Sequence, residues 1–271
     1  RRLSGQRRVG HAGTLDPLAT GVLVICLGWT TRLSQYLMEG AKHYRAVLRL
    51  GAVTDTYDAE GTIVSTVDDV DVTREDFLAA LARFKGAVEQ VPPMYSAVKR
   101  GGTPLYKLAR HGEVVERPKR SVYIYELVLE EWDMPFVTLS VLCSKGTYVR
   151  SLAHDLGQQL GCGAYLDSLT RLASGPFLLE EAVSLDELAR AFDEQRVSSL
   201  FFLLDRALPQ FDLLVVDDEV ADDIRHGRPV EGQTPIHGDL SLAFSCSGEP
   251  LALLQYDDDR RRWQPIKVFS R

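Results

Sequence analysis

A single carboxylate, Asp16, is the only acid between Arg1 and Met38, which makes it the first candidate for chemistry in this chain. Pro17 follows it, fixes its own φ angle and disfavours the α region for Asp16. Glycines at positions 10, 13 and 21 allow the backbone to turn sharply and a ligand to approach closely. The sequence therefore predicts a shaped loop that presents one carboxylate to a ligand.

The same two residues have a second interpretation, which is purely structural. Asp followed by Pro is a common helix start, with Asp as the N-cap and Pro at the first helical position. On spacing alone this interpretation is the stronger one. Capping and catalysis can also coexist at one residue.

Positive charge is concentrated in two segments of a chain whose net charge is -7. Residues 1–45 and 99–120 each carry seven Lys and Arg against two acids, whereas eight acids gather between positions 55 and 76. This segregation favours one face that binds a polyanion, although unrelated solvated faces would give the same pattern. The candidates for contacts with phosphate are Arg7, Arg8, Lys99, Arg100, Lys107 and Arg110.

Length and composition indicate ordinary globular material. The 271 residues are enough for one large domain or two smaller ones with a full core. No run of about 18 apolar residues occurs, so we expect no membrane-spanning helix. The four cysteines lie far apart without a C-x-x-C pair, which favours reduced thiols over a disulfide framework or a zinc site. The sequence thus predicts a cytoplasmic protein without a metal.

Hydrophobic periodicity predicts an α+β chain. Strands are expected over 22–28, 43–50 and 62–66, and a hairpin over 121–132 and 136–145. Helices are expected over 31–39, 73–85, 104–112 and 184–196, and another follows the glycine turn at 146 with Arg150 beside its apolar face. We place a domain boundary near Pro209. A strand, a helix that ends at Gly227 and three more strands are expected after it.

Four segments of the sequence resemble the TruB family of tRNA pseudouridine synthases. The stretch GHAGTLDPLATGVLVICLG is similar, residue after residue, to the catalytic motif of that family. The other three are KHYRAVLRLGAVTDTYDAEG, VPPMYSAVKRGGTPLYKLARHG and LCSKGTYVRSLAHDLGQQLGCGAYLDSLTRLASGPF, in the family's order and spacing. The resemblance covers almost the whole chain and weakens in the last sixty or so residues. The family begins with a further strand bearing a Lys-Pro element, which we expect to be missing here.

The resemblance implies a pseudouridine synthase fold, with a mixed, largely antiparallel central sheet flanked by helices. It implies a catalytic domain over 1–208 and a small β-rich, PUA-like RNA-binding domain over 209–271. The implied activity is isomerisation of uridine to pseudouridine at position 55, in the T-arm loop of tRNA, by a cytoplasmic monomer without a cofactor. Family members also bind tRNA and help it fold. A noncatalytic RNA-binding or RNA-folding protein is the alternative.

The resemblance also assigns roles to residues that would otherwise be unremarkable. Without it, Arg150 would be a surface charge, Tyr44 a strand residue and His11 a turn residue. Asp16 would be the catalytic carboxylate, and the resemblance leaves open whether it attacks C1′, attacks the uracil ring or assists proton removal. The residues around the base would be Arg150, which pairs with Asp16, Tyr44, which stacks on the base, Leu169, which closes the pocket, Tyr148 in the wall, and His11, which fills the place of the flipped base.

Overall fold

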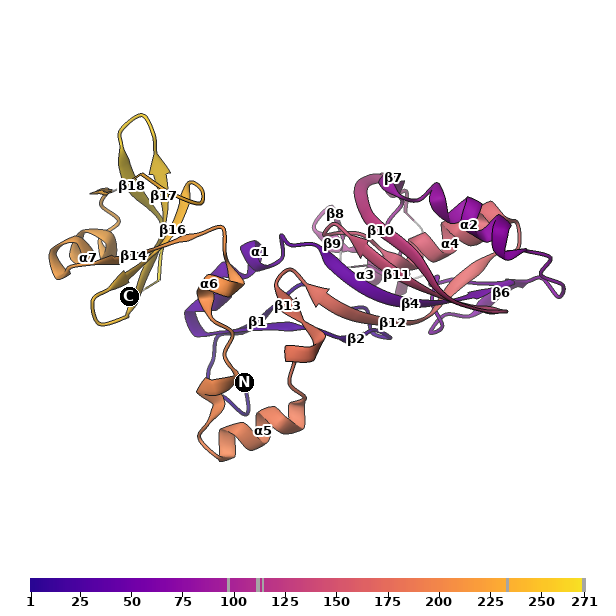
Figure 1. The fold of residues 1–271 in the computed structure, drawn as a ribbon, viewed down its shortest axis with the longest axis horizontal. Helices are drawn as coiled ribbons and strands as arrows, with labels where there is room; N and C mark the ends of the chain where they lie inside the picture. Colours follow the sequence, from indigo (N-terminus) through magenta and orange to yellow (C-terminus); the bar gives the residue numbers. More distant parts are fainter. Residues whose placement is uncertain (97, 111–112, 114, 233, 270–271) are drawn as a thin grey trace. The chain divides into compact units, whose positions relative to one another are not determined.

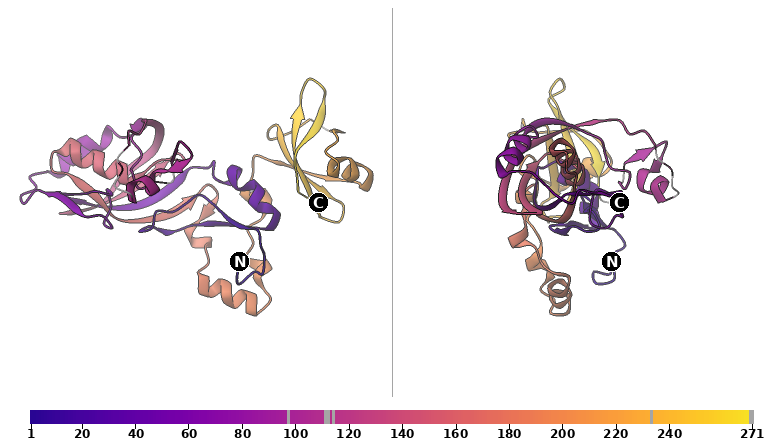
Figure 2. Two further views of the ribbon diagram at one scale, coloured as in Figure 1. Left: turned by 180° about the vertical axis from the view of Figure 1, so that it is seen from behind. Right: turned by 90° about the vertical axis from the view of Figure 1, so that its right-hand side faces the viewer.

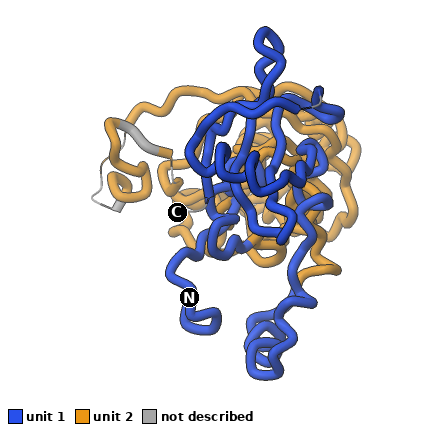
Figure 3. The backbone as a smooth tube through the Cα atoms, turned by 90° about the vertical axis from the view of Figure 1, so that its left-hand side faces the viewer, with its two compact units in different colours: residues 1–12, 25–37, 183–271 blue, residues 13–24, 38–182 orange. Residues whose placement is uncertain are grey.

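The computed structural model of the chain describes residues 1–96, 98–110, 113, 115–232 and 234–269. Its contacts divide it into two compact units, which Figure 3 shows in different colours. The sheet unit comprises residues 13–24 and 38–182, and the terminal unit comprises residues 1–12, 25–37 and 183–271. The boundary that the sequence places near Pro209 stays a prediction. Within the described residues, no helix is long and apolar enough to cross a membrane.

The strands of the sheet unit are β2 (Thr20–Gly21), β4 (Lys42–Leu50), β5 (Ala52–Thr54), β6 (Ile63–Thr66), β7 (Gly86–Gln90), β8 (Lys99–Arg100), β9 (Thr103–Pro104), β10 (Arg120–Asp133), β11 (Phe136–Cys143), β12 (Ala164–Ser174) and β13 (Phe177–Leu178). Seven of them form the central sheet, in the order β13-β12-β4-β11-β10-β7, with β2 beside β12 (Figure 1). Every pair is antiparallel except β2 with β12. The predicted α+β class and largely antiparallel sheet are confirmed.

Two helices bury one face of this sheet. Along β4 the side chains alternate, so that Tyr44, Ala46, Leu48 and Leu50 are buried in one hydrophobic core. Helices α2 and α4 lie against this face and contribute Phe77 and other apolar side chains (Figures 1 and 2). The helices of the sheet unit are α2 (Arg74–Ala82), α3 (Leu105–Arg110), α4 (Val149–Leu160) and the short 3-10 helix η2 (Leu179–Glu181).

The ends of the helices follow signals in the sequence. The hydroxyl of Thr73 accepts a hydrogen bond from the backbone N–H of Asp76 at 3.1 Å and so caps α2. Gly161, with φ of 77°, ends α4 in the left-handed conformation that favours glycine. Helix α4 begins at Val149, so Arg150 lies in its first turn.

The terminal unit contains a second sheet, which has five strands. Its order is β14-β16-β17-β18-β15, and only β14 with β16 is parallel. Its buried residues include Trp263, which packs edge-on against Tyr256. The predicted β-rich C-terminal part is present. The elements are β14 (Asp212–Val216), β15 (Val230–Glu231), β16 (Leu240–Ser245), β17 (Pro250–Asp257), β18 (Arg262–Val268), α5 (Leu185–Asp193), α6 (Leu204–Ala207), α7 (Asp218–Arg225), β1 (Val9–Ala12) and the 3-10 helix η3 (Val197–Leu200).

The segment over residues 22–39 differs from expectation. The strand expected over 22–28 is present as the shorter strand β3 (Val24–Leu27). It is not fully buried, because Ile25 is 51% exposed. The predicted helix is the 3-10 helix η1 (Gly28–Leu33), followed by only four residues of α1 (Ser34–Leu37). The hydroxyl of Thr30 donates to a carbonyl three residues earlier, at 2.7 Å. Such side-chain bonds compete with the α-helical pattern in a short helix.

The packing of α4 on β12 gives a stability prediction. Alanine usually stabilises a helix relative to glycine, but a Cβ atom at Gly157 would lie closer than 3.0 Å to the backbone of Gly163 and Ala164. We expect Gly157→Ala to lower the free energy of unfolding by about 1–3 kcal/mol through overpacking. Urea denaturation followed by circular dichroism measures it, with exposed Gln158→Ala as the control. A stabilised Gly157→Ala protein would contradict the packing described.

Candidate active site

Asp16 lies on a loop, residues 13–22, that precedes and enters β2. The backbone N–H of Ala19 donates to the carbonyl of Asp16 at 2.9 Å, which closes a turn with Pro17 at its second position. No helix begins here, so the interpretation of Asp16 as a helix cap is wrong. Gly21 has φ of 97°, and a Cβ atom there would overlap the backbone of β12. The backbone of the loop can therefore lie this close to β12 only because residue 21 is a glycine.

Arg150 meets the carboxylate of Asp16 with two hydrogen bonds. Its Nε donates to Oδ2 and its Nη2 donates to Oδ1, each at 2.8 Å. The side chain of Arg150 is 2% exposed and that of Asp16 is 25% exposed. A planar guanidinium that holds both oxygens fixes the direction of the carboxylate, and such charge-assisted bonds are strong. The structure thus brings together the two residues that the sequence analysis paired, and leaves the carboxylate within reach of solvent.

A second carboxylate, which the sequence analysis missed, holds the other side of Arg150. Asp58 Oδ2 lies 3.2 Å from Nη1, and Asp58 is as buried as the arginine. Its Oδ1 accepts the hydroxyl of Thr56 at 2.5 Å and the backbone N–H of Glu60 at 3.1 Å. Asp58 belongs to the acidic run over 55–76, which the sequence analysis treated as charge away from the polyanion face. Its place in the TDTYDAEG part of a resembling segment was the signal available.

Apolar and aromatic side chains accompany this ion cluster. Tyr44 on β4 and Leu169 on β12 are 9% and 5% exposed and belong to one core cluster, against which Leu18 of the Asp16 loop packs. Burial raises the pKa of the Tyr44 hydroxyl, and the charge of Asp16 adds a smaller rise. The predicted stacking residue, the predicted closing residue and the Asp16 loop thus meet in one region of the sheet unit.

Tyr148 is the residue immediately before α4. Its backbone N–H donates to Gln90 Oε1 at 3.1 Å, and its carbonyl accepts from Gln90 Nε2 at 3.3 Å. Burial raises the pKa of its hydroxyl, and the charge of Asp16 raises it further. Gln90 therefore fixes the backbone of Tyr148 at the start of α4, two residues before Arg150. The place of Tyr148 in the pocket wall stays a prediction.

The remaining predicted residues lie on other elements of the chain. His11 is exposed on β1 of the terminal unit, and Arg7 and Arg8 are exposed just before that strand. Lys107 is exposed on α3. Lys99 and Arg100 form β8 and Arg110 ends α3, but their side chains lie outside what the structure describes. The predicted roles of these residues stay predictions.

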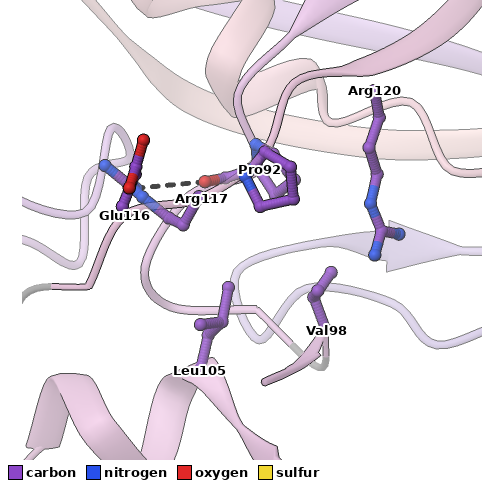
Figure 4. Close-up of a pocket in the computed structure, with 7 residues that line it drawn as sticks. Pro92, Val98, Leu105, Glu116, Arg117 and Arg120 are labelled. Carbon is purple, nitrogen blue, oxygen red and sulfur yellow. Dashed lines mark hydrogen bonds between the residues drawn. The ribbon is translucent and has the colours of Figure 1, made fainter. Parts of the chain in front are cut away.

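A pocket of about 450 Å³ lies in another part of the sheet unit (Figure 4). Arg117 and Arg120 line it together with apolar side chains, and Arg117 donates to the carbonyl of Pro92 at 3.0 Å. None of the residues assigned above to the uridine site lines this pocket. Among the described residues, no three His, Cys, Asp or Glu side chains form a group that could hold a metal ion.

Models of two protein families match the chain. The model described as "TruB family pseudouridylate synthase (N terminal domain)" matches residues 1–149. The model described as "tRNA pseudouridylate synthase B C-terminal domain" matches residues 150–215. Together they cover more than half of the chain, and Asp16 and Arg150 fall in the two different matches.

Curated relatives are similar over nearly the full length. The tRNA pseudouridine synthase B of Pseudomonas aeruginosa is 46% identical over 265 residues, which cover 96% of this chain and 86% of the relative. That of Syntrophotalea carbinolica is 48% identical over 280 residues, which cover 100% of this chain and 91% of the relative.

Solved structures share the fold. The structure titled "Crystal Structure of a Cbf5-Nop10-Gar1 Complex" superposes with a TM-score of 0.73 at 25% identity, and covers 99% of this chain and 78% of that chain. The structure titled "Structure of H/ACA RNP bound to a substrate RNA containing 2'-deoxyuridine" has a TM-score of 0.69 at 22% identity, with 100% and 78% covered. With both halves of the Asp16–Arg150 ion pair inside family-model matches and relatives nearly half identical throughout, this chain belongs to the TruB family of pseudouridylate synthases.

Proposed function

We propose that this protein isomerises uridine to pseudouridine in tRNA, at position 55 in the T-arm loop. The observation that carries the proposal is the partly exposed carboxylate of Asp16. Buried Arg150 donates a hydrogen bond to each of its oxygens, and the loop of Asp16 packs against apolar side chains. The relatives described above, which are named tRNA pseudouridine synthase B, support tRNA as the substrate. As further parts of the proposal, the protein acts in the cytoplasm as a monomer, with a catalytic domain over 1–208 and a PUA-like RNA-binding domain over 209–271.

The reaction is an internal exchange of bonds. The glycosidic bond between N1 and C1′ breaks, the uracil turns while still held, and a bond forms between C5 and C1′. C5 loses a proton and N1 gains one, so that no atom or electron is gained or lost overall. The reaction therefore needs neither a redox cofactor nor a hydrolytic water. A carboxylate can act as nucleophile or stabilise positive charge at the sugar carbon.

The walls of the site suit a reaction that must avoid water. Tyr44 offers an aromatic face for the uracil, and a stack of that kind is worth about 1–3 kcal/mol per base. Leu169 offers an apolar surface beside it. Excluding water protects the cleaved intermediate from hydrolysis. The target base must leave its stack at a cost of a few kcal/mol, and His11 is proposed to occupy its place in the RNA.

Removing the charge of Asp16 tests the catalytic assignment. We expect Asp16→Asn to abolish pseudouridine formation in a T-arm stem-loop transcript, because the amide is neither a nucleophile nor a negative charge. The affinity for the RNA should change little. Mass mapping of pseudouridine and filter binding measure the two quantities. Conversion by Asp16→Asn at the wild-type rate would contradict the catalytic assignment of Asp16.

Removing the charge of Asp58 tests the support of Arg150. Asp58→Asn leaves the buried guanidinium with one carboxylate, so we expect the free energy of unfolding to fall by about 1.5–3 kcal/mol. Without Asp58 the guanidinium of Arg150 should change its orientation toward Asp16, and we expect kcat to fall by up to about 100-fold while KM changes little. Steady-state kinetics and urea denaturation measure these effects. Asp55→Asn, at an exposed position three residues earlier, is the matched control, and an equal effect there would contradict the assignment.

Reversing charge in the second basic segment tests the RNA footprint. Arg100→Glu combined with Lys107→Glu should weaken tRNA binding and reduce the slope of log affinity against log salt by about 1–2. Pseudouridine formation at saturating tRNA should stay near the wild-type rate. Binding titrations over a range of salt concentrations make the measurement. An unchanged slope would place this segment outside the footprint.

A further inference from the structure

Arg171 on β12 is a buried arginine that the chemistry described above does not use. It is 1% exposed. On β12 it is two residues from Leu169, so the two side chains share one face of the sheet. Its cross-strand neighbour on β4 is Tyr44. Arg171 thus lies next to both residues proposed to contact the uracil.

The guanidinium of Arg171 reaches both ends of the loop that carries Asp16. Its Nε donates to the carbonyl of Val22 at 2.7 Å. Its Nη2 donates to the carbonyl of Gly13 at 3.2 Å, and its Nη1 to that of Thr14 at 3.4 Å. The backbone carbonyl of Arg171 also accepts the N–H of Val22 at 2.9 Å. One residue therefore ties the start and the end of the loop to the same strand.

The charge of Arg171 is balanced differently from that of Arg150. Arg150 pairs with two carboxylates, whereas the hydrogen bonds of the Arg171 guanidinium described above all end on loop carbonyls. The positive charge of Arg171 affects Lys42. Burial is the main cause that lowers the pKa of Lys42 to about 8, and the charge of Arg171 is the second. A buried charge is costly unless it is well bonded, so the loop carbonyls stabilise the buried guanidinium.

Arg171 also acts on Tyr44. Burial raises the pKa of the Tyr44 hydroxyl, whereas the positive charge of Arg171 opposes that rise. The same residue is thus bonded to the loop of the proposed catalytic carboxylate and paired across the strands with the proposed stacking residue.

We propose that Arg171 is a positioning residue for the isomerisation, which ties both ends of the Asp16 loop to the strand beside Tyr44. This inference rests on the proposed role of Asp16. The flat fork of an arginine supplies five donors in a fixed arrangement, so it can bond carbonyls on both sides of the loop. The ammonium of a lysine, a point charge on a flexible chain, cannot reproduce that arrangement. The role therefore depends on the shape of the side chain as well as on its charge.

The test compares Arg171→Lys and Arg171→Met with the wild-type protein in single-turnover assays on a T-arm stem-loop transcript. We expect the rate at saturating enzyme to fall about 100-fold in both variants, as for a displacement of the reacting group by about 1 Å. The Kd for the transcript should stay within about threefold of wild type, because Arg171 is buried. Added methylguanidinium should restore part of the rate in Arg171→Ala, whereas methylammonium should not.

Hydrogen exchange measured by mass spectrometry gives a readout independent of activity. In Arg171→Lys, amides of residues 13–22 should exchange faster, whereas those of α4 should not. Arg45→Met is the matched control, because Arg45 lies on the neighbouring strand with 47% of its side chain exposed. If Arg171→Met does not fold, the rate and exchange of Arg171→Lys decide the question.

Two outcomes separate this inference from the proposed function. Loss of activity in Asp16→Asn together with a wild-type rate in Arg171→Lys would overturn the role of Arg171 alone. Wild-type activity in Asp16→Asn would overturn the catalytic assignment on which the inference rests. Unchanged exchange over residues 13–22 in Arg171→Lys would also overturn the inference, whatever the rate.

Discussion

The site depends on the ion pairs that the buried guanidinium of Arg150 forms with two carboxylates. A cation taken out of water is costly, and the cost is offset only when carboxylates and hydrogen-bond acceptors surround it. Here Asp16, Asp58 and the carbonyl of Tyr95 provide those partners, at 2.8–3.2 Å. Three segments far apart in the sequence are thereby held to the first turn of α4. The orientation of the Asp16 carboxylate is a consequence of satisfying that one charge.

The two carboxylates around Arg150 have different environments and therefore different tasks. Asp58 is 2% exposed and its other oxygen is bonded within its own turn, so it has no free face for a ligand. Asp16 is 25% exposed and sits at the edge of the apolar core. One carboxylate stabilises the arginine, and the other can meet a nucleoside. The single accessible acid suits the proposed role of Asp16 in a reaction that exchanges a C–N bond for a C–C bond without water.

Close backbone approach is a second constraint on the site. Gly21 lets the Asp16 loop run against β12, and Gly157 lets α4 lie against the start of the same strand, since a Cβ atom at either position would overlap backbone atoms. The loop, the helix and the strand are thus packed at distances that only glycine allows. Within this packing, Arg171 on the strand donates a hydrogen bond to Val22 of the loop, and Arg150 on the helix donates one to Asp16.

The sequence by itself predicted most of the elements and singled out Asp16 and its partner Arg150. Alternating residues predicted β4, capping residues predicted the start of α2, and the motif around Asp16 singled out the carboxylate. These signals are local, because each depends on a few neighbouring residues and on the period of a helix or a strand. The short 3-10 helix over residues 28–33 was missed, since threonine side-chain bonds shift the balance between two similar helices.

Only the tertiary structure decided which charges are buried and with which partners. Asp58 lies in an acidic run that is typical of a solvated surface, yet it is enclosed with Arg150. Arg171 is a single arginine in a strand, and no pattern around it indicates that its side chain reaches a loop about 150 positions earlier in the chain. Burial and pairing depend on segments that meet only after folding, because desolvation and Coulomb energies are set by distance in space and not by separation in sequence.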